Sequence, residues 1–326
     1  MRDAGLETVH VALAANHAYL PGLEATLVSL VEASAVKDGI LFHIFADGLT
    51  EADMEGLRAL VRRHGYDLPL DFRFPDMAPI AARFKPYKDS YTAFLRLYFA
   101  EFFPELDWVL WSDADILWFR DPRELWSQRD ERFSLLWGRE TPSGQDRARV
   151  RFAEWDPDFP VDRYCCSGIA LMNLKLLRAM DIPGRSADFV ARWGTPLLPD
   201  QDLLNEFCHR SARIVDDRWG CYNPDPDWRK GVVLHCCGVS GFFGTMEYDD
   251  KWPMWALWFR YYRQVVRGDR AATVCSRPVR ALFWLCGSFY VPRRLIRTAA
   301  FWLSNEQVDN LAFAFFYAWI GRRRLW

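Results

Sequence analysis

Residues 108–118 read Trp-Val-Leu-Trp-Ser-Asp-Ala-Asp-Ile-Leu-Trp, with two carboxylates between two apolar runs. The first run, residues 108–111, is typical of a buried strand. Asp113 and Asp115 are two residues apart, so on extended backbone both side chains point the same way. Converging carboxylates repel each other and lose hydration, and a hard divalent cation relieves both costs. The stretch predicts a metal site, although a turn or a helix cap would also explain two aspartates at a strand end.

The chain before this stretch alternates between strand and helix patterns. Strands are predicted at residues 9–15, 40–46 and 70–74, and helices at residues 20–33, 51–64 and 91–103. Thr50 and Asp53 have the spacing of a capping box at the start of the second helix. The alternation is typical of an α/β fold with a doubly wound, mostly parallel sheet, in which ligands bind at the carboxyl ends of strands.

The second half is less regular. Strands are predicted at residues 133–137, 164–174 and 232–237, and helices at residues 186–193 and 201–209. Residues 138–161 are polar and rich in Arg, Asp and Pro. A connection of this length between strands predicts a loop that contacts the substrate.

Composition separates the two ends of the chain. The 326 residues have a net charge of −2, but from Arg260 onward 12 Arg face only three acids, a net charge of +9. We therefore predict a catalytic domain at residues 1–259 and a basic, aromatic, helical tail at residues 260–326. The apolar stretches 281–291 and 311–320 are shorter than the roughly 18–20 residues that span a bilayer.

Arginines interleaved with Trp, Phe and Tyr favour amphipathic helices lying on an anionic membrane surface. Packing of the tail against the catalytic domain as ordinary core is the alternative. Binding of single-stranded nucleic acid is disfavoured because the apolar density is too high. The start of the chain lacks the apolar region of a signal peptide, and the eight cysteines form no C-x-x-C motif. These features predict reduced cysteines and a cytoplasmic protein, peripheral on the inner face of the membrane.

Three further polar residues occur where such a site would use them. His235 ends the apolar run 232–234 and offers an imidazole nitrogen as a third metal ligand, although a histidine at a strand end is often structural. Asp200 precedes a predicted helix and would serve equally as its N-cap. Arg96 lies in the helix that leads to the Trp108 strand, where it would also fit a surface residue covering apolar neighbours.

The order of these motifs resembles glycosyltransferase family 8. The matching segments are residues 9–16 (Val-His-Val-Ala-Leu-Ala-Ala-Asn), Arg96, residues 111–117, residues 164–174, residues 199–205 (Pro-Asp-Gln-Asp-Leu-Leu-Asn) and residues 235–238 (His-Cys-Cys-Gly). The resemblance covers roughly residues 9–252 and is closest to bacterial lipopolysaccharide glucosyl- and galactosyltransferases. It implies a GT-A fold, a UDP-sugar donor, Mn²⁺ or Mg²⁺ in its place, and transfer with retention of anomeric configuration.

The resemblance also implies roles at matching positions. Asp113, Asp115 and His235 would hold the metal against the diphosphate, and the donor would also contact Ala14, Asn16, Tyr19, Arg96, Ala114 and Gly238. Asp200 would contact the donor sugar, and Gln201 would lie beneath its anomeric carbon. The implied reaction moves glucose or galactose to a glycan or lipid-linked glycan acceptor, such as a lipopolysaccharide core.

Two departures from the family pattern leave alternatives open. Cys166 stands where the family commonly has Asn, and Gly241 stands where it commonly has Lys. A degenerate nucleotide-sugar or glycan binder at the membrane is therefore one alternative. A haloacid-dehalogenase-like phosphotransferase is another, since it also uses D-x-D after an apolar strand. That motif normally continues with Thr or Val at the position of Leu117, and it lies nearer the chain start.

Overall fold

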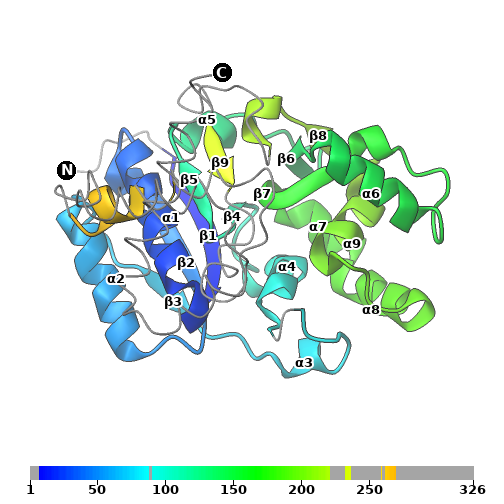
Figure 1. Cartoon of the computed structure of the whole chain (residues 1–326), viewed down its shortest axis with the longest axis horizontal. Coiled ribbons are helices and arrows are strands. Elements are labelled where there is room, and N and C mark those ends of the chain that lie inside the picture. The colour runs from blue at the N-terminus through cyan, green and yellow to red at the C-terminus, as the bar shows by residue number, and fades with distance from the viewer. Residues whose placement is uncertain (1–6, 88–89, 221–231, 236–257, 259–260, 269–326) are drawn as a thin grey trace, which may run out of the picture. The chain divides into compact units, whose positions relative to one another are not determined.

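The computed structural model describes residues 7–87, 90–220, 232–235, 258 and 261–268. The chain divides into two units, residues 1–240 and residues 241–326. In the first unit seven strands form one sheet in the order β3-β2-β1-β4-β7-β6-β8, and β5 pairs with β9 in a second sheet (Figure 1). The strands are β1 (Val9–Asn16), β2 (Ile40–Asp47), β3 (Asp71–Arg73), β4 (Trp108–Ser112), β5 (Ile116–Trp118), β6 (Leu135–Arg139), β7 (Cys165–Asn173), β8 (Ala212–Ile214) and β9 (Val233–His235).

Helices connect these strands. The α-helices are α1 (Leu20–Ala33), α2 (Glu51–Arg63), α3 (Ala78–Ala81), α4 (Phe99–Phe102), α5 (Arg123–Trp126), α6 (Pro142–Phe152), α7 (Leu174–Met180), α8 (Ile182–Trp193) and α9 (Pro199–Cys208). The 3₁₀-helices are η1 (His17–Tyr19), η2 (Lys37–Gly39), η3 (Thr92–Leu97), η4 (Val161–Arg163) and η5 (Asp217–Trp219), and a π-helix, η8 (Tyr262–Val266), lies in the second unit. Most of the predicted tail, residues 260–326, falls outside the described residues.

The directions of the strands confirm the predicted mostly parallel sheet. β1 runs parallel to β2 and β4, β2 runs parallel to β3, and β6 runs parallel to β8. β7 is antiparallel to both of its neighbours, β4 and β6. This reversal, which the sequence did not reveal, brings the start of β7 to the edge where β1 and β4 end.

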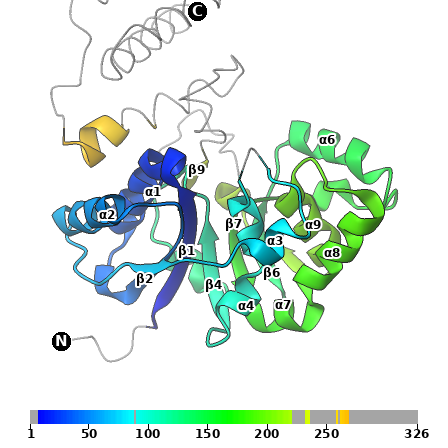
Figure 2. The same cartoon turned by 90° about the horizontal axis from the view of Figure 1, so that it is seen from below.

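Two hydrophobic layers cover the two faces of the sheet. In β1 the odd residues Val9, Val11 and Leu13 belong to a cluster with Leu23 and Leu27 of α1. The even residues face an opposite cluster, in which Ala12 and Ala14 join aromatic residues of η3 and α4 and apolar residues of α7 and α9. The views in Figures 1 and 2 place α1 and α2 on one side of the strands, with α4 and α7 on the other. Alternation along each strand therefore separates the two layers.

Local sequence signals explain where several helices begin. Thr50 Oγ1 accepts a hydrogen bond from the Asp53 backbone N–H (3.2 Å), and Asp53 Oδ2 accepts one from the Thr50 N–H (2.9 Å), which confirms the capping box of α2. Residues 138–161, predicted as a loop, contain α6, so the prediction of a loop was wrong, and contact of this segment with the substrate stays a prediction. Thr141 caps this helix and Pro142 occupies its first position, a start signal that the polar composition concealed.

The prediction of a single helix at residues 91–103 is also wrong. The segment forms η3 followed by the short helix α4, with Tyr98 between them. Four phenylalanines, residues 94, 99, 102 and 103, lie in this segment, and aromatic residues favour the α-helix less than Ala or Leu do. The tighter 3₁₀ turns bury the Arg96 side chain instead of leaving it on the surface.

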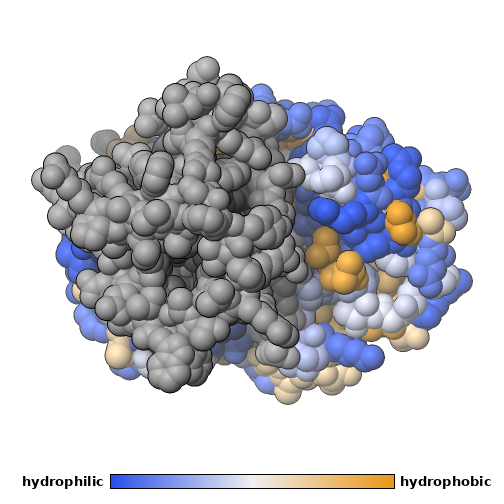
Figure 3. All heavy atoms as spheres, viewed as in Figure 1, coloured by the Kyte–Doolittle hydropathy of each residue, from blue (hydrophilic) through white to orange (hydrophobic). Residues whose placement is uncertain are grey.

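In the described ranges no helix is both long enough and apolar enough to cross a bilayer. The described part of the face in Figure 3 is largely hydrophilic, with scattered hydrophobic spots. Large apolar side chains that are exposed in the described residues are Phe74, Val150, Trp193 and Leu197. Isolated exposed apolar residues are ordinary on protein surfaces.

Candidate active site

The candidate site lies where β1 and β4 end and β7 begins. Because β1 and β4 are parallel, Asn16, the last residue of β1, and Asp113, which follows β4, lie at the same edge of the sheet. The antiparallel β7 brings Ser167 and Gly168 to that edge, and the Asp113 N–H donates to the Gly168 carbonyl oxygen (2.8 Å). Polar side chains from strands far apart in the sequence therefore meet at one edge.

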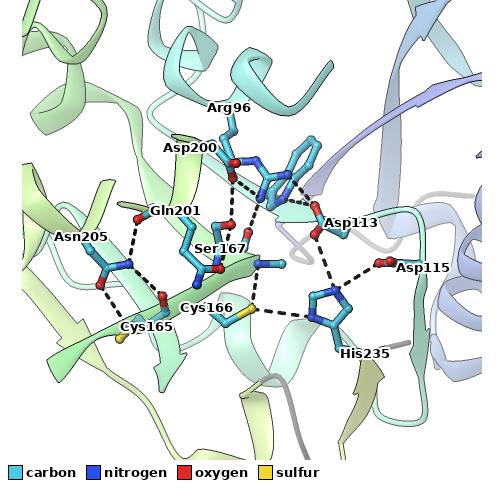
Figure 4. A network of polar contacts seen from close by, with 12 residues as sticks. Arg96, Asp113, Asp115, Cys165, Cys166, Ser167, Asp200, Gln201, Asn205 and His235 are labelled. Carbon is cyan, nitrogen blue, oxygen red and sulfur yellow. Dashed lines mark hydrogen bonds and ion pairs between the residues drawn. The ribbon is translucent and has the colours of Figure 1, made fainter. Parts of the chain in front are cut away.

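Asp113, Asp115 and His235 converge there. Each residue offers one ligand atom, and these atoms lie within 4.8 Å of one another. His235 Nε2 lies 3.1 Å from Asp115 Oδ1 and 3.6 Å from Asp113 Oδ2 (Figure 4). The imidazole reaches the carboxylates because His235 of β9 pairs with Ile116 of β5, the residue directly after Asp115.

The two carboxylates converge for a different reason from the one predicted. β4 ends at Ser112, and residues 114–115 form a turn before β5 begins. The side chains therefore meet because of a turn between two strands rather than because of alternation along one extended strand. The i, i+2 spacing therefore predicted correctly that the Asp113 and Asp115 carboxylates are neighbours, but it assumed the wrong backbone conformation.

Desolvation makes it costly to keep both carboxylates of this cluster charged. Asp115 is 7% exposed, and its Oδ1 atom is buried without a hydrogen-bond partner of good geometry. Burial raises the pKa of Asp113 to about 6, the Arg96 guanidinium opposes that rise, and the Asp115 carboxylate adds to it. Two oxygens and one imidazole nitrogen in such surroundings are a fitting ligand set for a divalent cation.

Arg96 connects the carboxylates of the site. Its Nη2 donates to Asp113 Oδ1 (2.7 Å), and its Nη1 lies 3.0 Å from Asp200 Oδ2 and donates to the Ser167 carbonyl oxygen (2.7 Å). The guanidinium carbon lies 4.4 Å from the centre of the Trp111 ring. With 7% of its side chain exposed, Arg96 is a buried bridging cation rather than a surface residue.

Asp200 and Gln201 are held by Ser167. Asp200 Oδ2 accepts a hydrogen bond from Ser167 Oγ (2.8 Å), and Gln201 Oε1 accepts one from the Ser167 backbone N–H (3.0 Å). Both residues are 7% exposed in the first turn of α9. Figure 4 places this group beside the Asp113 cluster, with Arg96 above both.

Of the remaining predicted donor contacts, all but Gly238 lie among the described residues. Ala14 and Asn16 lie at the end of β1, and Asn16 Oδ1 accepts a hydrogen bond from the Tyr19 N–H (3.2 Å), which holds η1 against the strand end. Ala114 is buried in the turn between the two aspartates. Gly238 lies outside the described residues, as does Gly241. The roles of all these residues in donor binding remain predictions.

Cys166 lies beside the candidate metal ligands. Its sulfur is 3.7 Å from His235 Nδ1 and accepts a hydrogen bond from the Gly168 N–H (3.4 Å). Cys166 is disulfide-bonded, whereas Cys165 and Cys208 are free. The prediction that the cysteines are reduced therefore does not hold at Cys166.

Comparison with known proteins agrees with this geometry. The family model of Glycosyl transferase family 8 matches residues 10–232. The chain belongs to glycosyl transferase family 8. The human protein glucoside xylosyltransferase 1 is 24% identical over 324 residues, covering 87% of this chain and 70% of its own length. A putative glycosyltransferase of Haemophilus influenzae is 21% identical over 257 residues, covering 73% of each chain.

Solved structures share the fold of this family 8 chain. The galactosyltransferase LgtC, crystallised with donor and acceptor sugar analogues, has a TM-score of 0.60 and 20% identity, covering 84% of this chain and 99% of its own. The bifunctional glycosyltransferase WbbM has a TM-score of 0.58 and 15% identity, covering 73% of this chain. This chain spans about half of WbbM, 47% of its length. Family membership removes the phosphotransferase alternative.

Sequence reasoning did not give a role to Ser167, Tyr164 or Arg151. Ser167 and Tyr164 lie inside a segment that carried the family resemblance, but their hydrogen bonds to Gln201 depend on the register of β7 against α9. Arg151 belongs to the segment predicted as a loop. No local pattern marks these three residues, because their partners are 34 to 51 positions away in the chain.

Proposed function

We propose that this family 8 protein is a metal-dependent retaining hexosyltransferase that uses a UDP-sugar donor. One observation carries the proposal: Asp113, Asp115 and His235 converge within 4.8 Å, beside the buried group of Arg96, Asp200 and Gln201. A cluster of possible metal ligands next to a buried polar group supports binding of a diphosphate at the metal ligands and of a sugar at the polar group.

The three ligand residues fit a divalent cation. Asp115 Oδ1 is buried with the His235 imidazole 3.1 Å away but no hydrogen bond of good geometry, and desolvation raises the pKa of Asp113 to about 6. A bound cation would favour the charged form of both carboxylates. Mn²⁺ accepts mixed oxygen and nitrogen ligands, and Mg²⁺ favours oxygen. When bound, the cation supplies positive charge that stabilises the leaving diphosphate.

The residues around it would orient the donor. Arg96 holds Asp113 and Asp200 in fixed positions through its two terminal nitrogens. Asp200 already forms an ion pair with Arg96 and accepts a hydrogen bond from Ser167 Oγ. Both interactions make its carboxylate a weaker nucleophile. Gln201 is neutral and is a poor nucleophile beside the carboxylates used for double displacement. We therefore favour attack from the leaving-group face, with Gln201 positioning the sugar, and trapping of a glycosyl adduct on Asp200 would contradict this.

For the transferred sugar and its acceptor we propose a chemical class rather than a single compound. The names of similar proteins include a xylosyltransferase and a galactosyltransferase, so the donor class varies among them. We propose glucose or galactose as the transferred sugar. A glycan or lipid-linked glycan, such as a lipopolysaccharide core, is the proposed acceptor.

A donor-hydrolysis panel tests this function without a known acceptor. The full-length protein would be incubated with UDP-glucose, UDP-galactose and UDP-xylose, each with Mn²⁺, with Mg²⁺ and with a chelator, and released UDP would be measured. We expect release from one hexose donor that depends on the cation. Binding of a UDP-sugar without release, and without transfer to any glycan, would instead favour the degenerate binder.

Residues 260–326 are proposed as a membrane-association tail, which places the enzyme peripherally on the inner face of the membrane. The net charge of +9 over this segment supports attraction to anionic lipid. Deletion of residues 270–326 should abolish sedimentation with vesicles containing phosphatidylglycerol, while vesicles of phosphatidylcholine serve as the uncharged control. Equal sedimentation of the full-length protein and the deletion variant with the anionic vesicles would refute the tail proposal.

A further inference from the structure

Gln201 is connected to three residues that no predicted role includes: Tyr164, Asp202 and Arg151. Gln201 Nε2 donates to Tyr164 Oη (2.9 Å), and Tyr164 Oη donates to Asp202 Oδ1 (2.6 Å). Arg151 donates to both oxygens of Asp202, from Nε to Oδ2 (2.9 Å) and from Nη2 to Oδ1 (2.8 Å). Tyr164 and Asp202 are 0% and 1% exposed, so water does not compete for these bonds.

The chemistry of the Asp202 carboxylate fixes the donor and the acceptor in each hydrogen bond that links Arg151, Asp202, Tyr164 and Gln201. Its two oxygens accept from Arg151 twice, from Tyr164 Oη and from the Leu198 backbone N–H (3.3 Å). An ionised carboxylate only accepts hydrogen bonds, so the Tyr164 hydroxyl proton must point at Asp202. The oxygen of Tyr164 is then an acceptor toward Gln201, and the group that faces it must be the amide nitrogen.

The other end of the Gln201 amide is fixed independently. The Ser167 backbone N–H can only donate, so the Gln201 atom 3.0 Å away must be the carbonyl oxygen. The second proton of Nε2 is directed at Glu140 Oε2 (3.2 Å). Burial and the Asp202 carboxylate also raise the pKa of Tyr164 well above its ordinary value, which keeps its hydroxyl protonated. Both ends of the amide therefore agree on one orientation.

We propose that Arg151, Asp202 and Tyr164 form a positioning relay, which holds the Gln201 amide with its oxygen toward Ser167 and its nitrogen toward Tyr164 during glycosyl transfer. The inference rests on the proposed function for its catalytic consequence. Asp202 follows Gln201 in the chain, and the hydrogen bonds of its carboxylate reach the Gln201 amide through Tyr164. Arg151 Nη2 also donates directly to Tyr164 Oη (2.9 Å). The relay adds three positioning residues to the site and assigns none of them contact with the donor.

The Tyr164→Phe variant removes one hydroxyl and keeps the ring. We expect kcat for donor hydrolysis to fall about 10- to 100-fold, because misplacement of a positioned group by about 1 Å can cost that much. The donor KM should change less than about threefold, since no contact with the donor is lost. Tyr66→Phe is the matched control: Tyr66 is 1% exposed, and its hydroxyl donates to the Ile40 carbonyl oxygen (3.0 Å), away from the site.

A double variant separates positioning from general stability. If Tyr164 acts through Gln201, the Tyr164→Phe change should lower kcat no further in a Gln201→Ala background. Effects that multiply in the double variant would overturn the relay. So would a Tyr164→Phe protein that loses melting temperature as Tyr66→Phe does while keeping wild-type kcat.

A spectroscopic measurement keeps the relay testable if no donor is turned over. The side-chain amide protons of Gln201, assigned by their loss in Gln201→Ala, should exchange slowly with solvent in the wild type and faster in Tyr164→Phe. Tyr66→Phe should leave their exchange unchanged. Equal exchange in all three proteins would refute the relay, whereas absent turnover of every donor by the wild type would refute the proposed function instead.

Discussion

Two neighbouring groups of side chains in the site differ in how far their polar atoms are satisfied. In the group of Asp113, Asp115 and His235, a buried carboxylate oxygen has no hydrogen-bond partner of good geometry. In the group of Gln201, Tyr164 and Asp202, each side-chain amide, hydroxyl and carboxylate makes its bonds within the protein. The two groups are connected through Arg96 and Ser167. Because they are neighbours, the difference in hydrogen bonding does not come from one group lying deeper in the protein than the other.

This difference separates a group that needs a ligand from one that is already organised. A buried charge whose hydrogen bonds are incomplete is costly, so the first group should gain most from a bound cation. A satisfied network should change little on binding, since its geometry is set before the ligand arrives. The two groups should therefore respond differently to mutation: the first through cation affinity, the second through kcat at unchanged cation affinity.

The largest effect should come from Asp115→Asn, which removes charge from the group that needs a cation. We expect the donor-hydrolysis rate to fall about 10²- to 10³-fold, the scale of one preorganised electrostatic group. The Mn²⁺ concentration needed for half-maximal rate should rise as well. Asp107→Asn is the control, because Asp107 is an exposed carboxylate 3.8 Å from Arg178. A wild-type rate and cation dependence in Asp115→Asn would show that the metal assignment is wrong.

A second test shifts the imidazole without changing any ligand. A Cβ atom on Gly168 would lie 2.3 Å from His235 Cε1 and 2.7 Å from Nδ1, so Gly168→Ala must displace the ring. We expect a loss of about 10- to 100-fold in rate, from misplacement of a positioned group. Raising the Mn²⁺ concentration should recover part of the loss.

Gly56→Ala provides the control for that substitution. Gly56 lies within α2, and an added Cβ there meets nothing within 4 Å. Alanine in a helix interior should stabilise the protein by about 0.5–1 kcal/mol and leave the rate unchanged. If Gly168→Ala behaved like Gly56→Ala, the close approach of β7 to His235 would have no functional importance.

The sequence predicted one group far better than the other. Asp113 and Asp115 lie between two apolar runs and His235 ends a third, so each was visible as a polar residue beside a predicted strand. The mostly parallel sheet was visible for the same reason, because β1, β2 and β4 are continuous apolar segments. In the second group only Gln201 was identified, and that came from the family resemblance rather than from any local pattern.

The missed features depend on contacts that a local pattern does not encode. The direction of β7 is set by its pairing with β4 and β6, and nothing in residues 164–174 marks it as antiparallel. Arg151 reaches Asp202 only because α6 forms where composition indicated a loop. The 3₁₀ segment η3 buries Arg96 in a way that helical periodicity over residues 91–103 does not predict.

A smaller effect is expected where the two groups meet. Ser167→Ala removes the hydroxyl that donates to Asp200 Oδ2 but keeps the backbone N–H that holds Gln201. Loss of one hydrogen bond to a charged group, about 1.5 kcal/mol, corresponds to a roughly 10-fold lower kcat/KM. The Mn²⁺ requirement should not change, which distinguishes this variant from Gly168→Ala.

Ser186→Ala is the matched control for Ser167→Ala. Ser186 is fully buried, and its hydroxyl has no hydrogen-bond partner within the described part of the chain. Removing it should leave the rate unchanged and the stability equal or slightly higher. A changed Mn²⁺ requirement in Ser167→Ala would mean that the two groups do not act separately.

The smallest effect concerns a histidine pair outside both groups, the partly buried His10 on β1 and the buried His43 on β2. His10 Nδ1 lies 2.9 Å from His43 Nε2, and His43 Nδ1 lies 2.6 Å from Asp71 Oδ2. Burial, followed by the neighbouring His43, lowers the pKa of His10 to about 4, and burial lowers that of His43. Both histidines are thus neutral in the fold at neutral pH, while the unfolded chain takes up protons below about pH 6.5.

Stability should therefore fall as the pH falls from about 6.5 toward 4, because the unfolded state binds more protons over that range. At pH 5 the loss from His10 should be about 1–2 kcal/mol, less than a full desolvation cost because the ring is partly exposed. Thermal melts of the wild type and of His10→Gln at pH 7.5 and pH 5 measure it, and the variant should lose less melting temperature between the two. Equal losses in both proteins would place the acid sensitivity outside His10.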